Sequence, residues 1–495
     1  MSATNSILNS YKWVMLARWI GRVAGIVSTL ILVRILTPDD YGIAAQALFV
    51  LMLFDALSHT GTEQFVIKQT SLTDDCLFTS WTLNLILKLI TAILIFGFSS
   101  QIAAFLNEDR LSDVLKVVAL VAIFSSLKSP ALIVLKRNMR FQEVSKVEII
   151  SKLTTVLLTI GLGVTLQTYW ALIWANVFSS ILVVLISYKI APIKIRLTLA
   201  NIKEQAHFAK GIFLTSLIGY IRAKLDILII SKKFGASSAG NYSLGQEFSL
   251  LPYTEAIAPL TQPLYSSLSK VKNNNTLLQK QLFKYMSISY ALVIPSAAGI
   301  FCLSDSIVDL LFGPQWADAI PVMSYLAILM VTFVTNGSYK IVFTLKSQFL
   351  GIALLDIIGI LLIASAFFIE RILSVGDFAM FRGLVGVSVL LTSILLAKML
   401  LKYKIKLALI AMFIPTLSSV GMVIFLVFYK PIVEQWININ WLSLLFLIAS
   451  SAIIYIVTWL ILMRLCSPYH YIWKFNTDLM RELKQTAFQK FNKSN

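Results

Sequence analysis

Apolar stretches long enough to cross a lipid bilayer recur along almost the whole sequence. A helix needs about 20 apolar residues to span the hydrocarbon core. Hydrophobic residues make up 58% of the chain and charged residues only 13%, a balance foreign to soluble domains of this size. The sequence therefore predicts an all-α membrane protein with fourteen spans, at roughly 12–35, 41–60, 78–100, 112–135, 147–166, 168–190, 209–231, 238–263, 283–304, 318–343, 349–369, 378–400, 407–429 and 441–463.

The loops between these spans differ in charge, and the difference predicts an orientation. Cytoplasmic loops of membrane proteins carry the excess of Lys and Arg. With a cytoplasmic N-terminus, the inside loops include "LKRNMRFQEVSK", "SKVKNNNTLLQKQLFK" and "LLKYKIK", and the outside turns include "LTPDD" and "LNEDRLSD". About twenty basic residues then lie inside against about six outside. We expect both termini in the cytoplasm, and we read the net charge of +18 as topological rather than as nucleic-acid binding.

A weak internal repeat divides the chain. "GRVAGIVSTLILVRILTPDDYGIAA" from Gly21 aligns with "GYIRAKLDILIISKKFGASSAGNYS" from Gly219, an offset of 198 residues that also aligns Gly42 with Gly240. Duplicated bundles of this kind build many transporters. The sequence predicts two six-helix bundles at 1–207 and 208–403, two further helices at 404–465 and a cytoplasmic amphipathic tail at 466–495.

The first span carries two arginines one helical turn apart, Arg18 and Arg22. At about 100° per residue they share a narrow arc with Gly25, while Ala17, Gly21 and Gly25 form a stripe of small residues beside it. A charge near the bilayer centre costs several kcal/mol unless it faces protein or water. We expect the small stripe to pack against another helix and the arginines to face something other than lipid. The plainer alternative is that they reach back to the inner interface.

The seventh span reads "YIRAKLDIL". Arg222 and Asp226 stand four residues apart and are expected to neutralise each other as a structural pair. Lys224 has no such partner on its own helix and is the better candidate for a ligand contact, with Arg222 as the second.

Other charges and two prolines lie within predicted spans. Asp55 and Glu255 are candidate carboxylates for binding a coupling H⁺ or Na⁺. Glu148 and Lys152, four residues apart, are expected to form a structural pair. The two prolines, Pro130 and Pro295, are expected to bend or interrupt their helices.

The segments "ARWIGRVAGIVSTLILVRILTPDDYGIAA" and "LKRNMRFQEVSKVEIISKL" resemble the polysaccharide transporter family of oligosaccharide (Wzx-like) flippases. Its superfamily also holds the lipid II flippase and the multidrug and toxin extrusion transporters. The resemblance implies two bundles around a central cavity that opens alternately to each side of the bacterial cytoplasmic membrane. It also implies an undecaprenyl-diphosphate-linked oligosaccharide as substrate, carried outward for O-antigen, capsule or exopolysaccharide synthesis.

The resemblance reaches one of the candidate site residues. The lipid II flippase has an "SRxxG" segment whose arginine faces the cavity; "ARWIG" matches it here and carries that role to Arg18. Arg22 rests on the helical arc alone, and Arg222 and Lys224 match no fixed motif. A transporter rather than an enzyme is implied, with no cofactor. The expected partners are membrane lipids and the polysaccharide polymerase machinery, and the expected state is a monomer.

Two rival functions stay open, and so does the driving force, which H⁺, Na⁺ or the membrane potential could supply. A cation-coupled drug antiporter shares the fold but would favour carboxylates in its cavity. A membrane glycosyltransferase or polymerase could place catalytic acids at Asp39 and Asp40, although "TPDDYG" also reads as a turn followed by a helix start.

Overall fold

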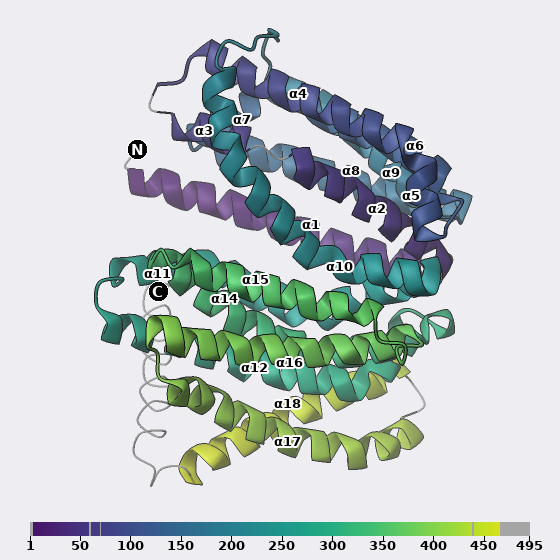
Figure 1. The fold of residues 1–495 in the computed structure, drawn as a ribbon. Coiled ribbons are helices and arrows are strands. Elements are labelled where there is room, and N and C mark those ends of the chain that lie inside the picture. The colour runs from purple at the N-terminus through teal and green to yellow at the C-terminus, as the bar shows by residue number, and fades with distance from the viewer. Residues whose placement is uncertain (1–2, 59–60, 70, 438–439, 466–495) are drawn as a thin grey trace. The chain divides into compact units, whose positions relative to one another are not determined.

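The computed structural model describes residues 3–58, 61–69, 71–437 and 440–465, with the backbone alone at 3–12 and 207–216. The chain forms two compact units, Met1–Ser243 and Leu244–Asn495. Both are built from helices, and the described residues contain no strand (Figure 1). The predicted amphipathic tail at 466–495 lies outside the described residues.

The first unit holds nine complete helices and most of a tenth. They are α1 (Ala3–Ile35), α2 (Pro38–Ser58), α3 (Thr62–Lys68), α4 (Asp74–Gly97), α5 (Ser99–Leu106), α6 (Leu111–Ser126), α7 (Ala131–Arg137), α8 (Phe141–Leu166), α9 (Trp170–Ile190) and α10 (Ile202–Ser249), which continues into the second unit. The longest packed pairs are α1 with α8 and α8 with α9.

The second unit begins with irregular turns and continues with long helices. They are η1 (Tyr253–Ile257), η2 (Ala258–Leu260), α11 (Thr261–Lys270), α12 (Asn275–Leu311), η3 (Pro314–Trp316), α13 (Ala319–Leu326), α14 (Leu329–Leu345), α15 (Phe349–Ala364), η4 (Ser365–Phe367), α16 (Val375–Leu401), α17 (Ile405–Trp436) and α18 (Asn440–Leu465). Its main core lies around α12, α14 and α16 and includes the fully buried Phe283, Tyr290 and Phe343.

The all-helical membrane prediction is confirmed, because the described part of every predicted window lies largely on helices. Among the described residues, 11 helices are long and apolar enough to cross a membrane, or up to 12 if the bent pair α6–α7 is one span. The predicted total of fourteen is not reproduced: the predicted windows 209–231 and 238–263, which lie wholly or partly on the bent segment α10, are not among the spanning helices of the described residues.

The α10 segment is sharply bent inside, and the bend has a clear cause. Gly235 adopts φ 82° and ψ −172°, a conformation that only glycine reaches without strain. Across this bend the Tyr242 hydroxyl donates a hydrogen bond of 2.9 Å to the carboxylate of Asp226, which is only 2% exposed. The two arms of α10 are therefore tied together by one buried polar contact.

The span at 112–135 is broken, as its proline predicts. The axes of α6 and α7 differ by 56°, and Pro130 directly precedes α7. Backbone groups freed at the break find side-chain partners: Trp81 Nε1 donates to the Lys128 carbonyl at 3.0 Å, and the Ser129 amide donates to Ser187 Oγ at 3.0 Å. Pro295 behaves differently and lies within the uninterrupted helix α12.

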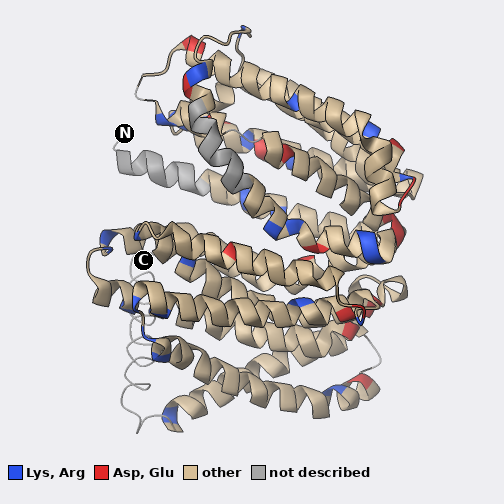
Figure 2. Cartoon of the chain, in the orientation of Figure 1, with Lys and Arg blue, Asp and Glu red and all other residues tan. Residues whose placement is uncertain are grey.

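Charged residues are unevenly distributed along the helices of the second unit. Lys and Arg gather at one end of these helices, and most Asp and Glu lie at the opposite end (Figure 2). Lys430 of α17 pairs with Asp305 of α12, which fixes the added helix α17 to the bundle. The orientation that the loop charges predict stays a prediction.

Two glycines of the repeat make a reciprocal contact inside the first unit. A Cβ on Gly42 would fall on the carbonyl of Ala236, and a Cβ on Gly240 would fall on the carbonyl of Pro38. Positions 38 and 236 differ by the repeat offset of 198 residues, and so do positions 42 and 240. Each repeat therefore contributes the same two positions to the contact. Such reciprocity is what a two-fold relation between repeats requires.

We expect Gly42→Ala to destabilise the protein, because the new methyl group forces the α2 and α10 backbones apart. Overpacking of this kind costs about 1–3 kcal/mol. The apparent Tm in detergent, followed by intrinsic fluorescence, should fall. Gly161→Ala is the matched control, since a Cβ there meets nothing within 4 Å. Equal Tm values for the two variants would contradict the tight contact.

Candidate functional site

The small residues of α1 form its packing face, as predicted. Ala17 is buried, and Gly21 and Gly25 lie against α8. Further along, Gly163 of α8 leaves room for Leu32 of α1, because a Cβ there would clash with the leucine. The two helices pack against each other at least from Gly21 to Leu32 of α1. This close approach decides which side of α1 is left for other contacts.

The two arginines lie next to this packing face. Arg18 is exposed, and Arg22 is half-buried about one turn further along α1. Arg22 is near the middle of the spanning segment Trp13–Ile35. A guanidinium at that depth costs several kcal/mol in hydrocarbon, so this arc of α1 must face water, protein or an anionic ligand.

A third basic residue, Lys152 of α8, lies on the glycine stripe of α1. A Cβ on Gly21 would be 3.3 Å from Lys152 Cγ, and a Cβ on Gly25 would be 3.9 Å from its Nζ. Within the part of the chain that the structure describes, Lys152 does not pair with Glu148, so that prediction is wrong. The sequence analysis looked for a partner of Lys152 only on its own helix. The glycine stripe was the available signal, because close packing over glycines leaves room for a long side chain.

The α10 candidates occupy a separate helix. Arg222 and Lys224 are both half-buried, whereas Asp226 is buried and accepts the hydrogen bond from Tyr242. Tyr220, one turn before Lys224, donates 2.5 Å to the Phe49 carbonyl of α2. Lys224 therefore lies one turn from the contact between α10 and α2. The Arg222–Asp226 pair stays a prediction.

Asp55 has a partner that the sequence did not indicate. Its carboxylate forms an ion pair with Lys88 of α4; the side chain of Asp55 is 53% exposed and that of Lys88 only 11%. The lysine is therefore the buried member. A proton or sodium ion at Asp55 would have to compete with this ammonium group.

Glu255 lies in the second unit, half-buried within the π-helical turn η1. Turns of this type occur often at functional sites. The turn has a counterpart in the first repeat. There α2 ends at Ser58, and the next helix, α3, is preceded by Gly61, which has a φ of 65°. Shifted by the repeat offset, Gly61 falls on Pro259 of η2. In each repeat the second helix is interrupted, and the carboxylate candidate lies within about two helical turns before the break.

Asp39 and Asp40 have structural partners at the start of α2. Asp40 accepts hydrogen bonds from the Thr37 amide at 3.1 Å and the Tyr169 amide at 2.9 Å. Asp39 accepts a bond of 2.6 Å from Arg110, which also donates to Glu108. The hydrogen bonds that Arg110 donates, first to Glu108 and then to Asp39, raise the pKa of its guanidinium above the usual range. The contacts favour the turn and helix start over catalytic acids.

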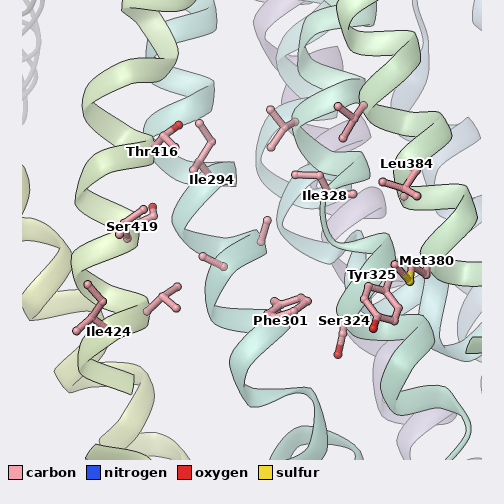
Figure 3. Close-up of a pocket in the computed structure, with 17 residues that line it drawn as sticks. Ile294, Phe301, Ser324, Tyr325, Ile328, Met380, Leu384, Thr416, Ser419 and Ile424 are labelled. Carbon is pink, nitrogen blue, oxygen red and sulfur yellow. The ribbon is translucent and has the colours of Figure 1, made fainter. Parts of the chain in front are cut away.

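The second unit contains an apolar pocket of about 530 Å³. Figure 3 shows Ile294 and Phe301 of α12 between Ile424 of α17 and, on the other side, Ile328 and Leu384. Hydrocarbon lines nearly all of it, and no charged side chain is among its lining residues. Among the described residues no cluster of His, Cys, Asp and Glu could hold a metal ion.

Comparison with known proteins decides the family. Residues 31–321 match the family model described as "Polysaccharide biosynthesis protein". The chain belongs to this family. It is 23% identical over 337 residues to the lipopolysaccharide biosynthesis protein WzxC of Escherichia coli, covering 66% of this chain and 68% of that protein. It is also 25% identical over 303 residues to the succinoglycan biosynthesis transport protein ExoT of Rhizobium meliloti, covering 60% and 61%.

Solved structures show the same fold in transporters. The lipid II flippase MurJ, in an inward closed conformation, matches with a TM-score of 0.72 at 16% identity, over 91% of this chain and 98% of that one. An inward-facing multidrug resistance MATE family transporter matches with a TM-score of 0.59 at 11% identity, over 77% and 94%. The family member is therefore a multi-pass membrane protein with a transporter fold.

We expect Asp55→Asn to destabilise the protein, because it leaves the buried Lys88 ammonium without its counter-charge. Removing one partner of a buried pair costs about 3–5 kcal/mol, which solvent screening at the half-exposed Asp55 lowers to about 1–3 kcal/mol. Thermal unfolding of the purified protein measures the loss. The double variant Asp55→Asn/Lys88→Met should recover most of it, and no recovery would contradict the pairing. Lys116→Met, in an exposed pair with Asp113, is the control and should change little.

Proposed function

We propose that this protein is a flippase for undecaprenyl-diphosphate-linked oligosaccharides, moving them from the inner to the outer leaflet by alternating access. The observation that carries the proposal is the arginine pair of α1. Arg18 and Arg22 lie in a spanning helix, beside its packing face, in a member of the polysaccharide biosynthesis protein family. The similarity to ExoT, a transport protein, and to MurJ, a flippase, supports transport rather than catalysis.

The chemistry of the substrate explains why arginine is suited to this place. A guanidinium offers paired donors that match phosphate oxygens, and the bond is stronger where water is scarce. We infer that Arg18 and Arg22 bind the diphosphate, that Lys224 and Arg222 of α10 add positive charge, and that the sugars occupy the aqueous lumen. The prenyl chain stays in the bilayer, which spares the protein from enclosing it.

The proposal extends to architecture and setting. It divides the chain into two six-helix bundles at 1–207 and 208–403, with 404–465 as an addition. The loop charges support cytoplasmic termini in a bacterial inner membrane. A monomer suffices, because one chain supplies both repeats. The product, a lipid-linked repeat unit on the outer leaflet, is what a polysaccharide polymerase consumes.

The source of energy is a separate part of the proposal. Asp55 is neutralised by Lys88, whereas Glu255 lies in a π-helical turn, so we rank Glu255 first as the group that binds H⁺ or Na⁺. The membrane potential alone is the third route, since the carrier is rich in positive charge.

Substrate binding tests the function directly. Native mass spectrometry of the purified protein should show selective binding of undecaprenyl diphosphate over undecaprenol, which has a neutral head. A charged hydrogen bond contributes about 1.5–3 kcal/mol, so Arg18→Ala/Arg22→Ala should weaken binding at least about tenfold. Arg18→Lys/Arg22→Lys should retain part of the affinity, because it keeps the charges.

The control for this experiment lies on the same helix. Arg34→Ala removes an exposed arginine in the last turn of α1 and should leave binding unchanged. Preferential binding of a cationic dye such as ethidium would favour a drug antiporter and overturn the flippase proposal. Equal binding by wild type and the double alanine variant would show that the arginines are interfacial anchors.

The coupling group is tested by transport in proteoliposomes. We expect Glu255→Gln to abolish stimulation of flipping by an imposed ion gradient while a membrane potential still drives it. Asp55→Asn/Lys88→Met, which removes both charges of the pair, should keep the gradient response. The opposite pattern would assign coupling to the Asp55–Lys88 pair.

A further inference from the structure

Lys152 lies in a groove made by two missing side chains. Gly21 and Gly25 stand one turn apart on α1, and the lysine stem lies across both. A Cβ on Gly21 would be 3.3 Å from Lys152 Cγ, and one on Gly25 would be 3.8 Å from Cε. The stem therefore passes Gly21 first and Gly25 second, parallel to the axis of α1.

This direction is unusual for a lysine in a membrane helix. Long basic side chains normally turn toward the nearest interface, and helical side chains lean toward the N-terminus of their own helix. Lys152 runs the other way, from the level of Gly21 to that of Gly25, near the middle of the span Trp13–Ile35. The glycine groove holds the ammonium at a depth that lysine otherwise avoids.

The ammonium at this depth requires a partner that the described residues do not supply. Lys152 is exposed, in the middle of the spanning helix α8, and no described side chain forms a hydrogen bond or ion pair with it. An exposed cation at the centre of a span faces a watery cavity or an anionic ligand, because hydrocarbon costs it several kcal/mol. If Lys152 served only for packing, its aliphatic chain would be enough and the ammonium group would not be needed.

The position of Lys152 relates it to the arginines of α1. On the helical wheel, Gly25 borders the arc of Arg18 and Arg22, at about 60° from Arg22. The Lys152 ammonium therefore enters beside this arc, close to the level of Arg22 and deeper than Arg18. The two planar guanidinium groups of Arg18 and Arg22 and the ammonium group of Lys152, on adjoining surfaces, match an anion with several phosphate oxygens.

We propose that Lys152 is a third binding residue for the lipid diphosphate and that Gly21 and Gly25 position it. The inference rests on the proposed function, because it names a further contact for the same substrate. The diphosphate meets Arg18 first from the inner side, and Lys152 then binds it together with Arg22 near the membrane centre.

Charge and packing are separated by two substitutions of Lys152. Lys152→Met keeps an unbranched stem in the groove and removes the charge; it should weaken binding of undecaprenyl diphosphate about tenfold, with no change for undecaprenol. Lys152→Arg should retain most of the affinity. Lys146→Met is the matched control on the same helix, exposed one and a half turns nearer its start, and should have no effect.

The groove itself is tested by a double-mutant cycle. Gly21→Ala puts a methyl group in tight contact with the stem and should weaken diphosphate binding a few-fold, but only while Lys152 is present. In the Lys152→Met background the same change should have no further effect on binding. Gly161→Ala on α8, where a Cβ would meet nothing within 4 Å, is the control for loss of a glycine.

The outcomes separate the two proposals. If wild type fails to prefer undecaprenyl diphosphate over undecaprenol, the proposed function fails. If wild type shows the preference and Arg18→Ala/Arg22→Ala loses it while Lys152→Met does not, the third contact alone is wrong. Equal losses in Lys152→Met and Lys146→Met would reduce the effect to general surface charge and would also overturn it. Thermal unfolding of each variant confirms that binding is compared between folded proteins.

Discussion

The cost of placing charge in hydrocarbon organises the polar residues of this protein. Several charges within the spans have an opposite charge on a neighbouring helix: Lys88 with Asp55, Lys340 with Asp356, and Lys430 with Asp305. The basic residues at the α1–α8 contact are arranged differently. Lys152 and Arg18 are exposed, and both lie beside a packed glycine face. Pairing gives the first group a structural role, and we propose that the exposed second group forms a surface for an anion.

The glycines of α1 allow close helix packing, and we propose that they also position Lys152. Without side chains at Gly21 and Gly25, α1 can approach α8, and the space along the stripe admits the lysine stem. At the start of α2, Gly42 and Gly240 allow a second close approach, this time between repeat-equivalent positions. Interrupted helices follow the repeat as well, at Gly61 and at η1–η2. Small residues and broken helices are therefore placed by the repeat, whereas the charges differ between its halves.

Much of the fold followed from local pattern. The helical character of the chain, the break at Pro130 and the packing stripe of α1 depend on residues close in sequence. The structure has the break and the stripe where they were expected, although it does not reproduce all fourteen predicted spans. The Lys and Arg residues of the loops, from which the orientation is predicted, could also be counted directly from the sequence. The site was harder, since Lys152 was assigned to Glu148 at helical spacing and Asp55 was considered alone. Spacing along one helix identifies partners on that helix and carries no information about the helix next to it.

The sequence by itself determined that this is a multi-pass helical membrane protein, that Arg18 and Arg22 share one side of α1, and that small residues border them. These properties depend on hydrophobicity and the helical period, which are local. The tertiary structure alone decided that Lys152 crosses to α1, that Lys88 neutralises Asp55, and that Asp226 bonds to Tyr242 across a bend. The physical reason is that side-chain partners in a membrane bundle depend on the rotation and register of neighbouring helices, and many rotations bury similar apolar area.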